Sequence, residues 1–491
     1  MTRYIADTIV TCDKQGSVYS PGVLEVVSGI ITYVGPGSHL QEPQIGSIEH
    51  SSQTGQLVDT PQTGQFRDIP QVGQIAPTPQ TGQFLDTPQV GQIATSKEFP
   101  NQVVRLDGLL MPGLVNTHCH SPMTLLRGVG EGLPLGRWLR EAIWPREARL
   151  SGQDIYWGMS LACAEMLRNG VTTSCEMYFY PEETASAAID AGMRSVVTPG
   201  ILLDPAWEKL GPWEQQLEAV SRIHDSFEGA GKGLISVGFA AHAAYTLPLE
   251  AIVGVATRST ELGTVFHIHL AETQGECSDL EERSGCSVTK LLADGGVFDG
   301  DVLAAHCVWL SDQDIEILAI NDVSVAHCPQ SNAKLGSGIA RVADMVDAGV
   351  NVSLGTDGPA SNNNLDLWEE MRLCLLLAAS GGRGPESLGV ERALAMATRH
   401  GAKAVGRSDI GSLEVGKAAD MIFVDIDDPV FTPVVNSQDI LSHLAWSGDS
   451  RFIRSVWVSG EQVVSEGQCI SVDVDEAKRQ VQQRAVRIAQ S

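Results

Sequence analysis

The sequence predicts an α/β fold built around a (β/α)8 barrel, and two observations support this prediction. First, from about residue 110 onward short apolar segments alternate with amphipathic helical segments, which is the pattern of a parallel sheet covered by helices. Second, five of the predicted strands end at a histidine, and barrel enzymes build their active sites at these C-terminal strand ends. The eight predicted strand ends lie near His118, Glu176, Pro199, His242, His269, His306, His327 and Asp357.

The predicted helices fit between these strands. Ser151 can cap the first of them, and Gly170 can close it. Residues at helical spacing give this helix one apolar face, made of Ile155, Met159, Ala162 and Met166. Further helices are expected over residues 183–191, 213–227, 248–262, 312–320 and 339–348.

The composition of the chain excludes some classes of protein and of binding partner. The chain has 491 residues, 43% of them hydrophobic, which excludes a globally disordered protein. Asp and Glu number 60 against 33 Lys and Arg, so the net charge is −27. Nucleic acids and anionic membranes would repel such a chain, so we expect a small-molecule substrate, no nucleic acid and no membrane. The sequence leaves the oligomeric state open, a homo-oligomer included.

Two further features predict a cytoplasmic location. No apolar run approaches the ~20 residues that span a bilayer, and the start of the chain lacks the apolar core of a secretory signal. The ten cysteines are scattered and contain no CxxC pair, so we expect neither a disulfide framework nor a Cys-type zinc site.

One segment differs from the rest of the chain. Residues 54–98 repeat a nine-residue unit five times, as TGQLVDTPQ, TGQFRDIPQ, VGQIAPTPQ, TGQFLDTPQ and VGQIATSKE. Proline limits sheet pairing and glycine resists helix formation, so we expect a mostly disordered surface insertion over residues 44–98. A β-solenoid, which also has a short period, is the alternative interpretation. The flanks, residues 30–36 and 103–111, read as strands that such an insertion can join.

Histidine motifs at the predicted strand ends indicate a metal site. His118 and His120 are two residues apart, so both imidazoles face the same side of a strand. In HIHLAE, His269 offers a third nitrogen, and Glu272 lies just past the strand end, where it can exchange a proton with water at the metal.

Two further motifs extend this set, with His306 in LAAHCVWL and Asp357 in GTDGPASNNN. These polar groups are far apart in the sequence, yet all lie at predicted C-terminal strand ends. Such an arrangement is hard to explain by core packing, so we predict that they share one metal centre.

Longer stretches around these motifs carry a family resemblance. The chain resembles the metal-dependent amidohydrolase superfamily, in the branch of methylthioadenosine/S-adenosylhomocysteine deaminases and triazine hydrolases. The matching stretches are PGLVNTHCHSPMTLLRG, LPLGRWLREAIWPREARL, EMLRNGVTTSCEMYF, HIHLAET, AAHCVWL, SNAKLGSGIA, GTDGPASNNNLDLWEEMR and GSLEVGKAADMIFVD. They cover almost everything except residues ~44–98.

The resemblance implies a (β/α)8 TIM barrel plus a small β-sandwich built from both chain termini. The sandwich would take residues 1–43, 99–107 and 407–491, the last with a C-terminal helix, around a barrel at 108–406 and the insertion at 44–98. Strands within 5–34 and 103–106 would then pair with strands at 421–424, 455–458 and 462–464.

The resemblance also implies roles for single residues. The implied metal ligands are His118, His120, His269 and Asp357, and they would bind one divalent metal ion per chain, usually Zn²⁺. Relatives with two metals add a bridging lysine after the fourth strand, but the corresponding FAAHAAYTLP contains no lysine. Three imidazoles and one carboxylate leave a coordination position for water, whose pKa zinc can lower to about 7.

The implied catalytic residues are Glu272, His306 and Asp357. Glu272 resembles the general acid/base, and Asp357 can also accept the water proton. His306 resembles the histidine that hydrogen-bonds the attacking water or the tetrahedral intermediate.

Two residues match substrate-contacting positions of the family. Glu147 would accept hydrogen bonds from ribose hydroxyls, with a solvated helix carboxylate as the alternative interpretation, and His242 would contact the substrate at the fourth strand. His327 is expected to be structural or to lie behind the site. The cysteines that follow histidines, Cys119, Cys307 and Cys328, should turn into the core by strand alternation.

One departure bears on the substrate. Relatives that take S-adenosylhomocysteine have arginines after the third strand, where this chain has Pro199. We therefore expect a zinc-dependent aminohydrolase that releases ammonia from adenosine, 5′-deoxyadenosine or methylthioadenosine. The alternatives are a C–N or C–Cl hydrolase of the same superfamily acting on a triazine-, pterin- or pyrimidine-like ring, and a catalytically inactive interaction protein.

Overall fold

The computed structural model of the chain describes residues 1–39 and 102–490, so the predicted insertion at 44–98 lies outside the described residues. The described chain is an α/β structure with three sheets, two of them parallel. None of the helices in these two ranges has the length and apolar character that a membrane crossing requires. The ten cysteines all lie in the described part and are free thiols.

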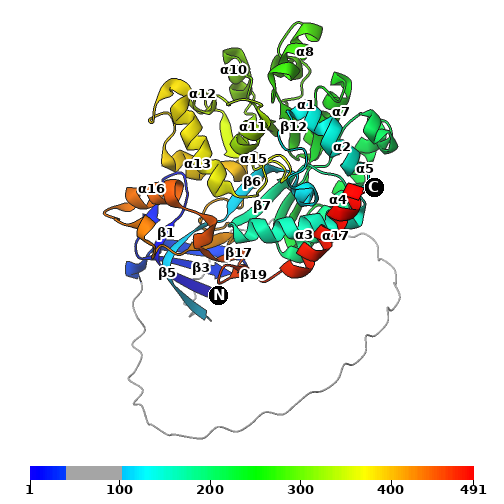
Figure 1. Cartoon of the computed structure of the whole chain (residues 1–491). Coiled ribbons are helices and arrows are strands. Elements are labelled where there is room, and N and C mark those ends of the chain that lie inside the picture. Colours follow the sequence, from blue (N-terminus) through cyan, green and yellow to red (C-terminus); the bar gives the residue numbers. More distant parts are fainter. Residues whose placement is uncertain (40–101, 491) are drawn as a thin grey trace, which may run out of the picture. The chain divides into compact units, whose positions relative to one another are not determined.

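The parallel strands occupy the middle of the chain, where the sequence predicts them (Figure 1). Their order is β10-β8-β7-β6 in one sheet and β15-β14-β13-β12-β11-β9 in the other. The predicted third and fourth strands are each divided in two, as β8/β9 and β10/β11. The bounds are β6 (Leu114–Cys119), β7 (Val171–Glu176), β8 (Arg194–Val197), β9 (Gly200–Ile201), β10 (Ile235–Val237), β11 (Phe239–Ala243), β12 (Phe266–Leu270), β13 (Val302–His306), β14 (Ser324–His327) and β15 (Asn351–Leu354).

These strands are buried along their length, as parallel strands covered by helices on the outside must be. Most of them end within a residue or two of the predicted position. The eighth is the exception, since β15 stops at Leu354 and Asp357 lies in the turn that follows. Asp357 adopts a left-handed conformation with φ of 60°, which a strand cannot accommodate.

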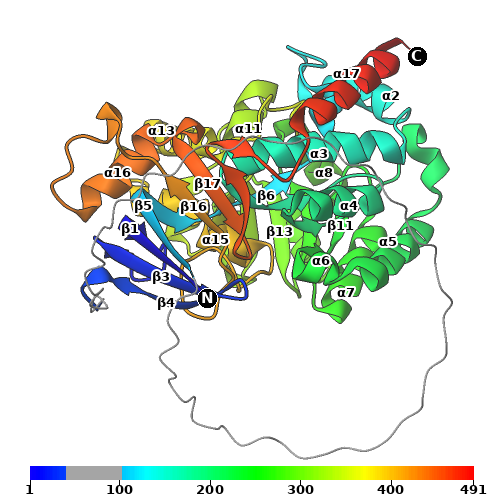
Figure 2. The same ribbon diagram turned by 90° about the horizontal axis from the view of Figure 1, so that it is seen from below.

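Helices follow the strands and cover the parallel sheets (Figures 1 and 2). Ser151 and Asp154 form a capping box at the start of α3, so the predicted N-cap is confirmed. The bounds are α1 (Leu135–Arg137), α2 (Trp144–Glu147), α3 (Gly152–Arg168), α4 (Pro181–Ala191), α5 (Trp213–Phe227), α6 (Ala230–Gly233), α7 (Leu249–Leu262), α8 (Gln274–Ser284), α9 (Val288–Asp294), α10 (Asp312–Ile320), α11 (Pro329–Leu335), α12 (Val342–Asp347), α13 (Leu367–Ala378), α14 (Val390–Met396), α15 (Arg399–Ala404), α16 (Ser437–Ser447) and α17 (Val474–Gln490).

The third sheet combines both ends of the chain. Its strand order is β19-β18-β17-β16-β5-β1-β3-β4, with β2 paired to β1. In Figure 1 its N-terminal strands are blue, β5 is cyan-blue, and the strands from the end of the chain are orange to red. β5 pairs with β16, but through residues 109–112; the predicted segment, residues 103–106, pairs with β1 instead. The bounds are β1 (Thr2–Val10), β2 (Val18–Tyr19), β3 (Gly22–Val27), β4 (Ile30–Pro36), β5 (Gln102–Pro112), β16 (Met421–Val424), β17 (Ile453–Val458), β18 (Glu461–Ser465) and β19 (Gln468–Cys469).

One polar contact ties the third sheet to β8, and another ties the C-terminal helix to α3. Arg194 on β8 makes a buried, bidentate ion pair with Asp420, with N–O distances of 2.9 and 3.0 Å. At the other end, Arg487 of α17 donates to the Asp154 carboxylate of α3 at 2.6 Å. These contacts join the first residue of β8 and the first turn of α3 to the C-terminal part of the chain.

Candidate active site and metal centre

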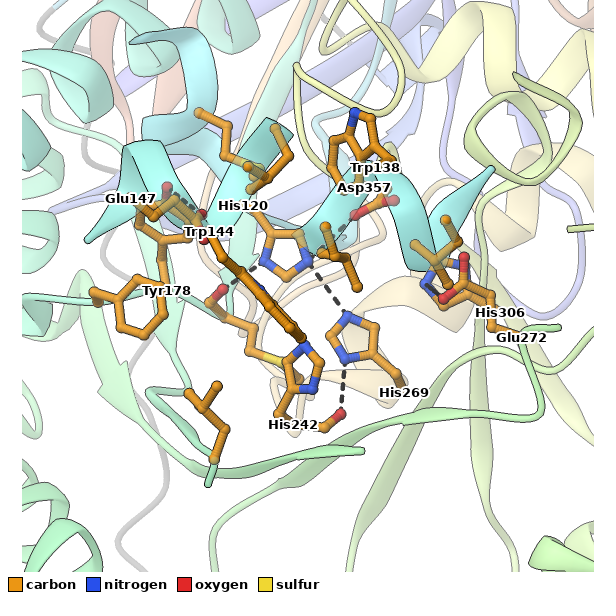
Figure 3. Close-up of a pocket in the computed structure, with 18 of the residues that line it drawn as sticks. His120, Trp138, Trp144, Glu147, Tyr178, His242, His269, Glu272, His306 and Asp357 are labelled. Carbon is orange, nitrogen blue, oxygen red and sulfur yellow. Dashed lines mark hydrogen bonds and ion pairs between the residues drawn. The ribbon is translucent and has the colours of Figure 1, made fainter. Parts of the chain in front are cut away.

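A pocket lies at the C-terminal ends of the parallel strands (Figure 3). Polar groups from the strand ends form its floor, and an aromatic and apolar face covers them. The lining residues are His120, Met123, Leu135, Trp138, Leu139, Ile143, Trp144, Glu147, Met177, Tyr178, Phe179, Gly200, Leu202, His242, Tyr245, His269, Glu272, His306 and Asp357. The structure thus brings together seven of the eight predicted site residues in one lining, with His118 directly behind it.

The four predicted metal ligands lie in contact with one another. Nε2 of His120 is 3.3 Å from Nε2 of His269 and 3.3 Å from Oδ1 of Asp357. Nε2 of His118 is 3.5 Å from the same carboxylate oxygen. Ligands placed ~2.1 Å from a tetrahedral metal lie about 3.4 Å apart, so these spacings fit a common metal ion.

The outer nitrogens of these imidazoles have partners that aim Nε2 at the cluster. Nδ1 of His120 donates to the Met177 carbonyl at 2.5 Å, and Nδ1 of His269 donates to the His242 carbonyl at 2.8 Å. Nδ1 of His118 lies 2.9 Å from Nε2 of His267. Such outer partners are typical of metal-binding histidines, because they fix the ring and its tautomer.

Two hydroxyls orient the carboxylate of Asp357. Ser331 and Ser361 both donate to Oδ2, at 2.6 and 2.8 Å, which leaves Oδ1 toward the histidines. Burial alone raises the pKa of Asp357, but its contacts with His118 and His120 outweigh burial and hold that pKa well below the usual value. The side chain is therefore an anion at neutral pH.

The donor set suits a divalent metal. Nε2 of His118 is buried and makes no hydrogen bond, which is costly unless something else fills its lone pair. Burial lowers the pKa of His118 to about 3, and burial together with the neighbouring His118 lowers that of His269 well below the usual value. Neutral imidazoles beside one carboxylate are the ligands that zinc prefers.

His306 also belongs to this cluster. Its ligand atom lies within 4.8 Å of those of His118 and His269, and the trio His118, His120 and Asp357 satisfies the same limit. Nδ1 of His306 donates to Oδ1 of Asn332 at 2.9 Å, so Nε2 faces the pocket. His306 has a left-handed backbone with φ of 74°, a strained conformation that turns its ring toward the other strand ends.

Glu272 lies beside His306 on the right of Figure 3, with Oε2 3.8 Å from Nε2 of that histidine. Ser337 donates to Oε1 at 3.1 Å, and the backbone N–H of Glu272 donates to Glu276 at 2.9 Å. Burial raises the pKa of Glu272 above the usual value, which favours the protonated form that a general acid needs.

Glu147 and Tyr178 form a second polar pair across the pocket. The Tyr178 hydroxyl donates to Oε1 of Glu147 at 2.7 Å. Burial raises the pKa of Glu147 to about 7, although the hydrogen bond from Tyr178 acts in the opposite direction. Glu147 is only 4% exposed, so the alternative interpretation of a solvated helix carboxylate is wrong.

His242 lines the pocket between these two regions. Its Nδ1 is 3.0 Å from the Thr246 hydroxyl, and its ring lies 4.9 Å from that of His269. Burial lowers the pKa of His242 to about 3, so it is a neutral hydrogen-bonding group.

Sequence reasoning missed the aromatic cover of the pocket. Trp138, Trp144 and Glu147 come from one helical segment, α1 to α2, in which a π-helical stretch (Trp138–Ile143) separates two short α-helical turns. Such stretches often occur at functional sites. The sequence signal for this segment is its spacing, with six residues from Trp138 to Trp144 and three from Trp144 to Glu147.

The remaining sequence predictions concern residues outside the pocket lining. His327 is buried and does not line the pocket. Cys119, Cys307 and Cys328 are fully buried, as predicted, although Cys307 and Cys328 lie just past the ends of β13 and β14 rather than within a strand.

The comparisons with known proteins agree on one family. The model of the amidohydrolase family matches residues 109–463. A 5-methylthioadenosine/S-adenosylhomocysteine deaminase from Moorella thermoacetica is 42% identical over 380 residues, covering 77% of this chain and 87% of the relative. A 5′-deoxyadenosine deaminase from Methanosarcina mazei is 42% identical over 399 residues, covering 80% of this chain and 90% of the relative.

Solved structures are also similar. An adenosine deaminase from Xanthomonas campestris with bound zinc has a TM-score of 0.83 at 30% identity, covering 100% of this chain and 99% of that one. Atrazine chlorohydrolase from Arthrobacter aurescens, with a TM-score of 0.79 at 20% identity, shares the fold over 99% of this chain and 100% of its own. Because the family match spans most of the sequence and both curated relatives exceed 40% identity, the chain belongs to the amidohydrolase family.

Proposed function

We propose that this protein is a zinc-dependent aminohydrolase that releases ammonia from an adenine nucleoside such as adenosine, 5′-deoxyadenosine or methylthioadenosine. The observation that carries the proposal is the placement of Glu272 and Glu147 in one pocket, with the histidine–aspartate cluster at its floor. Relatives at 42% identity carry the names of deaminases of such nucleosides.

In this proposal one metal ion is held by His118, His120, His269 and Asp357. Their donor spacings of 3.3–3.5 Å and the unpartnered Nε2 of His118 support this ligand set. When bound, zinc supplies Lewis-acid activation of water near neutral pH. His306 then acts from the edge of the cluster as a hydrogen-bonding group for charge that develops at the attacked carbon.

The proton transfers fall to Glu272 and Asp357. Glu272, with a raised pKa, protonates a ring nitrogen of the adenine and so makes the neighbouring carbon electrophilic. Asp357 keeps its charge and can accept a proton from the attacking water. Glu272 later helps to deliver a proton to the departing amino group, which leaves as ammonia.

The opposite wall binds the rest of the nucleoside in this proposal. Trp138, Trp144 and Tyr178 offer faces for the base and the sugar, and Glu147 accepts hydrogen bonds from ribose hydroxyls. His242 contacts the substrate between Glu147 and the metal ligands. A substrate without a ribose would leave the buried Glu147 carboxylate without this partner.

The substrates should differ in rate according to their 5′ groups. Adenosine, 5′-deoxyadenosine and methylthioadenosine should be deaminated faster than S-adenosylhomocysteine, because the pocket lining contains no Arg or Lys to meet its carboxylate. The loss of a charge-assisted hydrogen bond costs about 1.5–3 kcal/mol, or roughly 10- to 150-fold in kcat/KM. Ammonia release from the four compounds measures this ratio. A preference for S-adenosylhomocysteine would contradict it and implicate Arg140 or Arg283, which line the neighbouring cavity.

Substrate binding should also depend on pH through Glu147. Its carboxyl gains charge as the pH rises through about 7, and a charged acceptor binds ribose hydroxyls more strongly. We expect KM to rise several-fold, about fivefold for ~1 kcal/mol, between pH 8 and pH 6. Glu147→Gln should raise KM, remove this pH dependence and leave the zinc content unchanged. A KM profile that is the same in both proteins would exclude this role.

We also propose that the two parallel sheets close into one (β/α)8 barrel. Support comes from two bonds to the first strand, β6. Thr117 donates to the Leu354 carbonyl of the last strand, β15, at 2.8 Å, and the N–H of Asp357, just after β15, donates to the His118 carbonyl at 2.9 Å. At the other seam, Gly238 alone separates β10 of one sheet from β11 of the other, and its N–H donates to the Val197 carbonyl of β8 at 2.9 Å.

The third sheet is proposed to fold over as a small β-sandwich. Tyr4 on β1 packs edge-on against Trp457 on β17 at 5.4 Å, although β5 and β16 separate these strands in the sheet. The proposed domains are the sandwich from 1–43, 99–107 and 407–491, and the barrel from 108–406, although β5 continues in the third sheet to Pro112. A cytoplasmic location is proposed as well, and ten free thiols support it.

A further inference from the structure

The proposed ligands differ in what their outer nitrogens meet. His120 and His269 donate from Nδ1 to backbone carbonyls, at 2.5 and 2.8 Å. A carbonyl can only accept, so these bonds leave Nε2 with a lone pair. His118 instead meets Nε2 of His267 at 2.9 Å, and an imidazole nitrogen can donate or accept. Something else must therefore determine which nitrogen of His118 carries the proton.

The structure continues this contact into a chain that ends at a hydroxyl. Nδ1 of His267 lies 3.0 Å from Oγ1 of Thr198. The Thr198 hydroxyl in turn donates its proton to the Glu176 carbonyl at 3.1 Å. All members of the chain are buried, with both histidines and Thr198 at 0% exposure, so water does not compete for these bonds.

Along these hydrogen bonds two proton orders are consistent; Sγ of Cys175, 3.7 Å from Nδ1 of His267, is a more distant partner than the Thr198 hydroxyl at 3.0 Å. When Thr198 donates to the carbonyl, its oxygen accepts from Nδ1–H of His267, whose Nε2 then accepts from Nδ1–H of His118. Nε2 of His118 is left with a lone pair that faces the cluster. In the reverse order every proton shifts by one bond, and His118 presents an N–H that cannot bind a metal.

We propose that His267 and Thr198 are positioning residues that set the tautomer of His118 for metal binding. The proposal rests on the metal site of the proposed function and adds residues that touch neither substrate nor metal. Thr198 decides which of the two proton orders is adopted, because the carbonyl of Glu176 is a fixed acceptor for its hydroxyl proton. His267 transmits this proton order to His118, because one of its ring nitrogens contacts Thr198 and the other contacts His118.

Zinc affinity, measured on the full-length protein by competition with a chelator, tests the proposal. His267→Phe keeps a buried ring without its nitrogens, and Thr198→Val keeps the shape without the hydroxyl. Both should weaken zinc binding by about 10- to 100-fold, the usual effect of losing a partner behind a ligand. Thr198→Ser should restore the affinity, since it restores the hydroxyl.

Ser195→Ala is the matched control, because Ser195 is equally buried on the adjoining strand β8 and its hydroxyl has no partner. Its zinc affinity should equal that of the unmodified protein. Thermal unfolding without metal identifies any variant that fails to fold. If His267→Phe does not fold, the comparison of zinc affinity between Thr198→Val and Thr198→Ser tests the proposal alone.

Histidine-selective ¹⁵N NMR of the zinc-loaded protein gives a second readout. It should find His267 and His118 both protonated at Nδ1. Unchanged zinc affinity in Thr198→Val, or a proton on Nε2 of His267, would overturn the proposal while leaving the deaminase assignment intact. If the unmodified protein binds no zinc, the proposed metal site itself fails, and the role of His267 fails with it.

Discussion

Replacing Glu272 by glutamine is expected to lower kcat by about 10²- to 10⁴-fold, the usual contribution of a positioned acid/base group. Glutamine has the same shape and can keep the hydrogen bond from Ser337, so the pocket should be preserved. It cannot give or take a proton at the adenine ring, so the chemical step should fail. Because Glu272 is not one of the proposed metal ligands, the zinc content should not change.

Steady-state ammonia release and elemental analysis of the same preparation measure both quantities. Glu281→Gln serves as the control. Glu281 is an exposed carboxylate of α8, the helix that follows Glu272, and this variant should retain full activity. Unreduced turnover of Glu272→Gln would contradict the acid/base role. Loss of zinc along with activity would instead assign Glu272 to the metal site.

Replacing Asp357 by alanine should abolish metal binding and activity together. Its carboxylate is the only anion among the proposed ligands, and Oδ1 lies 3.3 and 3.5 Å from two of the other donor atoms. Loss of a partner behind a ligand costs about 10- to 100-fold in metal affinity, so loss of the ligand itself should cost more. Replacing His118 by alanine should have the same outcome.

The metal content of purified protein checks this expectation, with His443→Ala as the control. His443 is a histidine of α16 that contacts the Pro433 carbonyl and lies outside the cluster. The unmodified protein and this control should hold close to one zinc per chain. Two metals per chain would contradict the mononuclear assignment, and full zinc content in Asp357→Ala would exclude Asp357 as a ligand.

The helices were predictable from the sequence where a local capping pattern marks their start. Helix α10 follows a capping box at Ser311 and Asp314, and its observed bounds are those expected. The helix expected over 339–348 is shorter, as α12 (Val342–Asp347), because Arg341 adopts a non-helical conformation at its start. Ile339, the first residue of the expected range, is 56% exposed.

The site was predictable where chemistry coincides with a strand end. Histidines two residues apart on one strand must face the same side, which is why His118 and His120 could be paired from sequence. The same spacing in His267 and His269 was present, but the sequence does not tell that His267 lies behind His118. β6 and β12 belong to different sheets, so the contact between them depends on how the two sheets pack together, which no local pattern describes.

The most direct test of the central claim is ammonia release by the zinc-loaded protein from 5′-deoxyadenosine, set against amino-substituted triazine, pterin and pyrimidine rings. We expect rapid release from the nucleoside, loss of that release when a chelator removes the metal, and much slower release from rings without a ribose. Release of ammonia from a free ring, with no turnover of any adenine nucleoside, would contradict it.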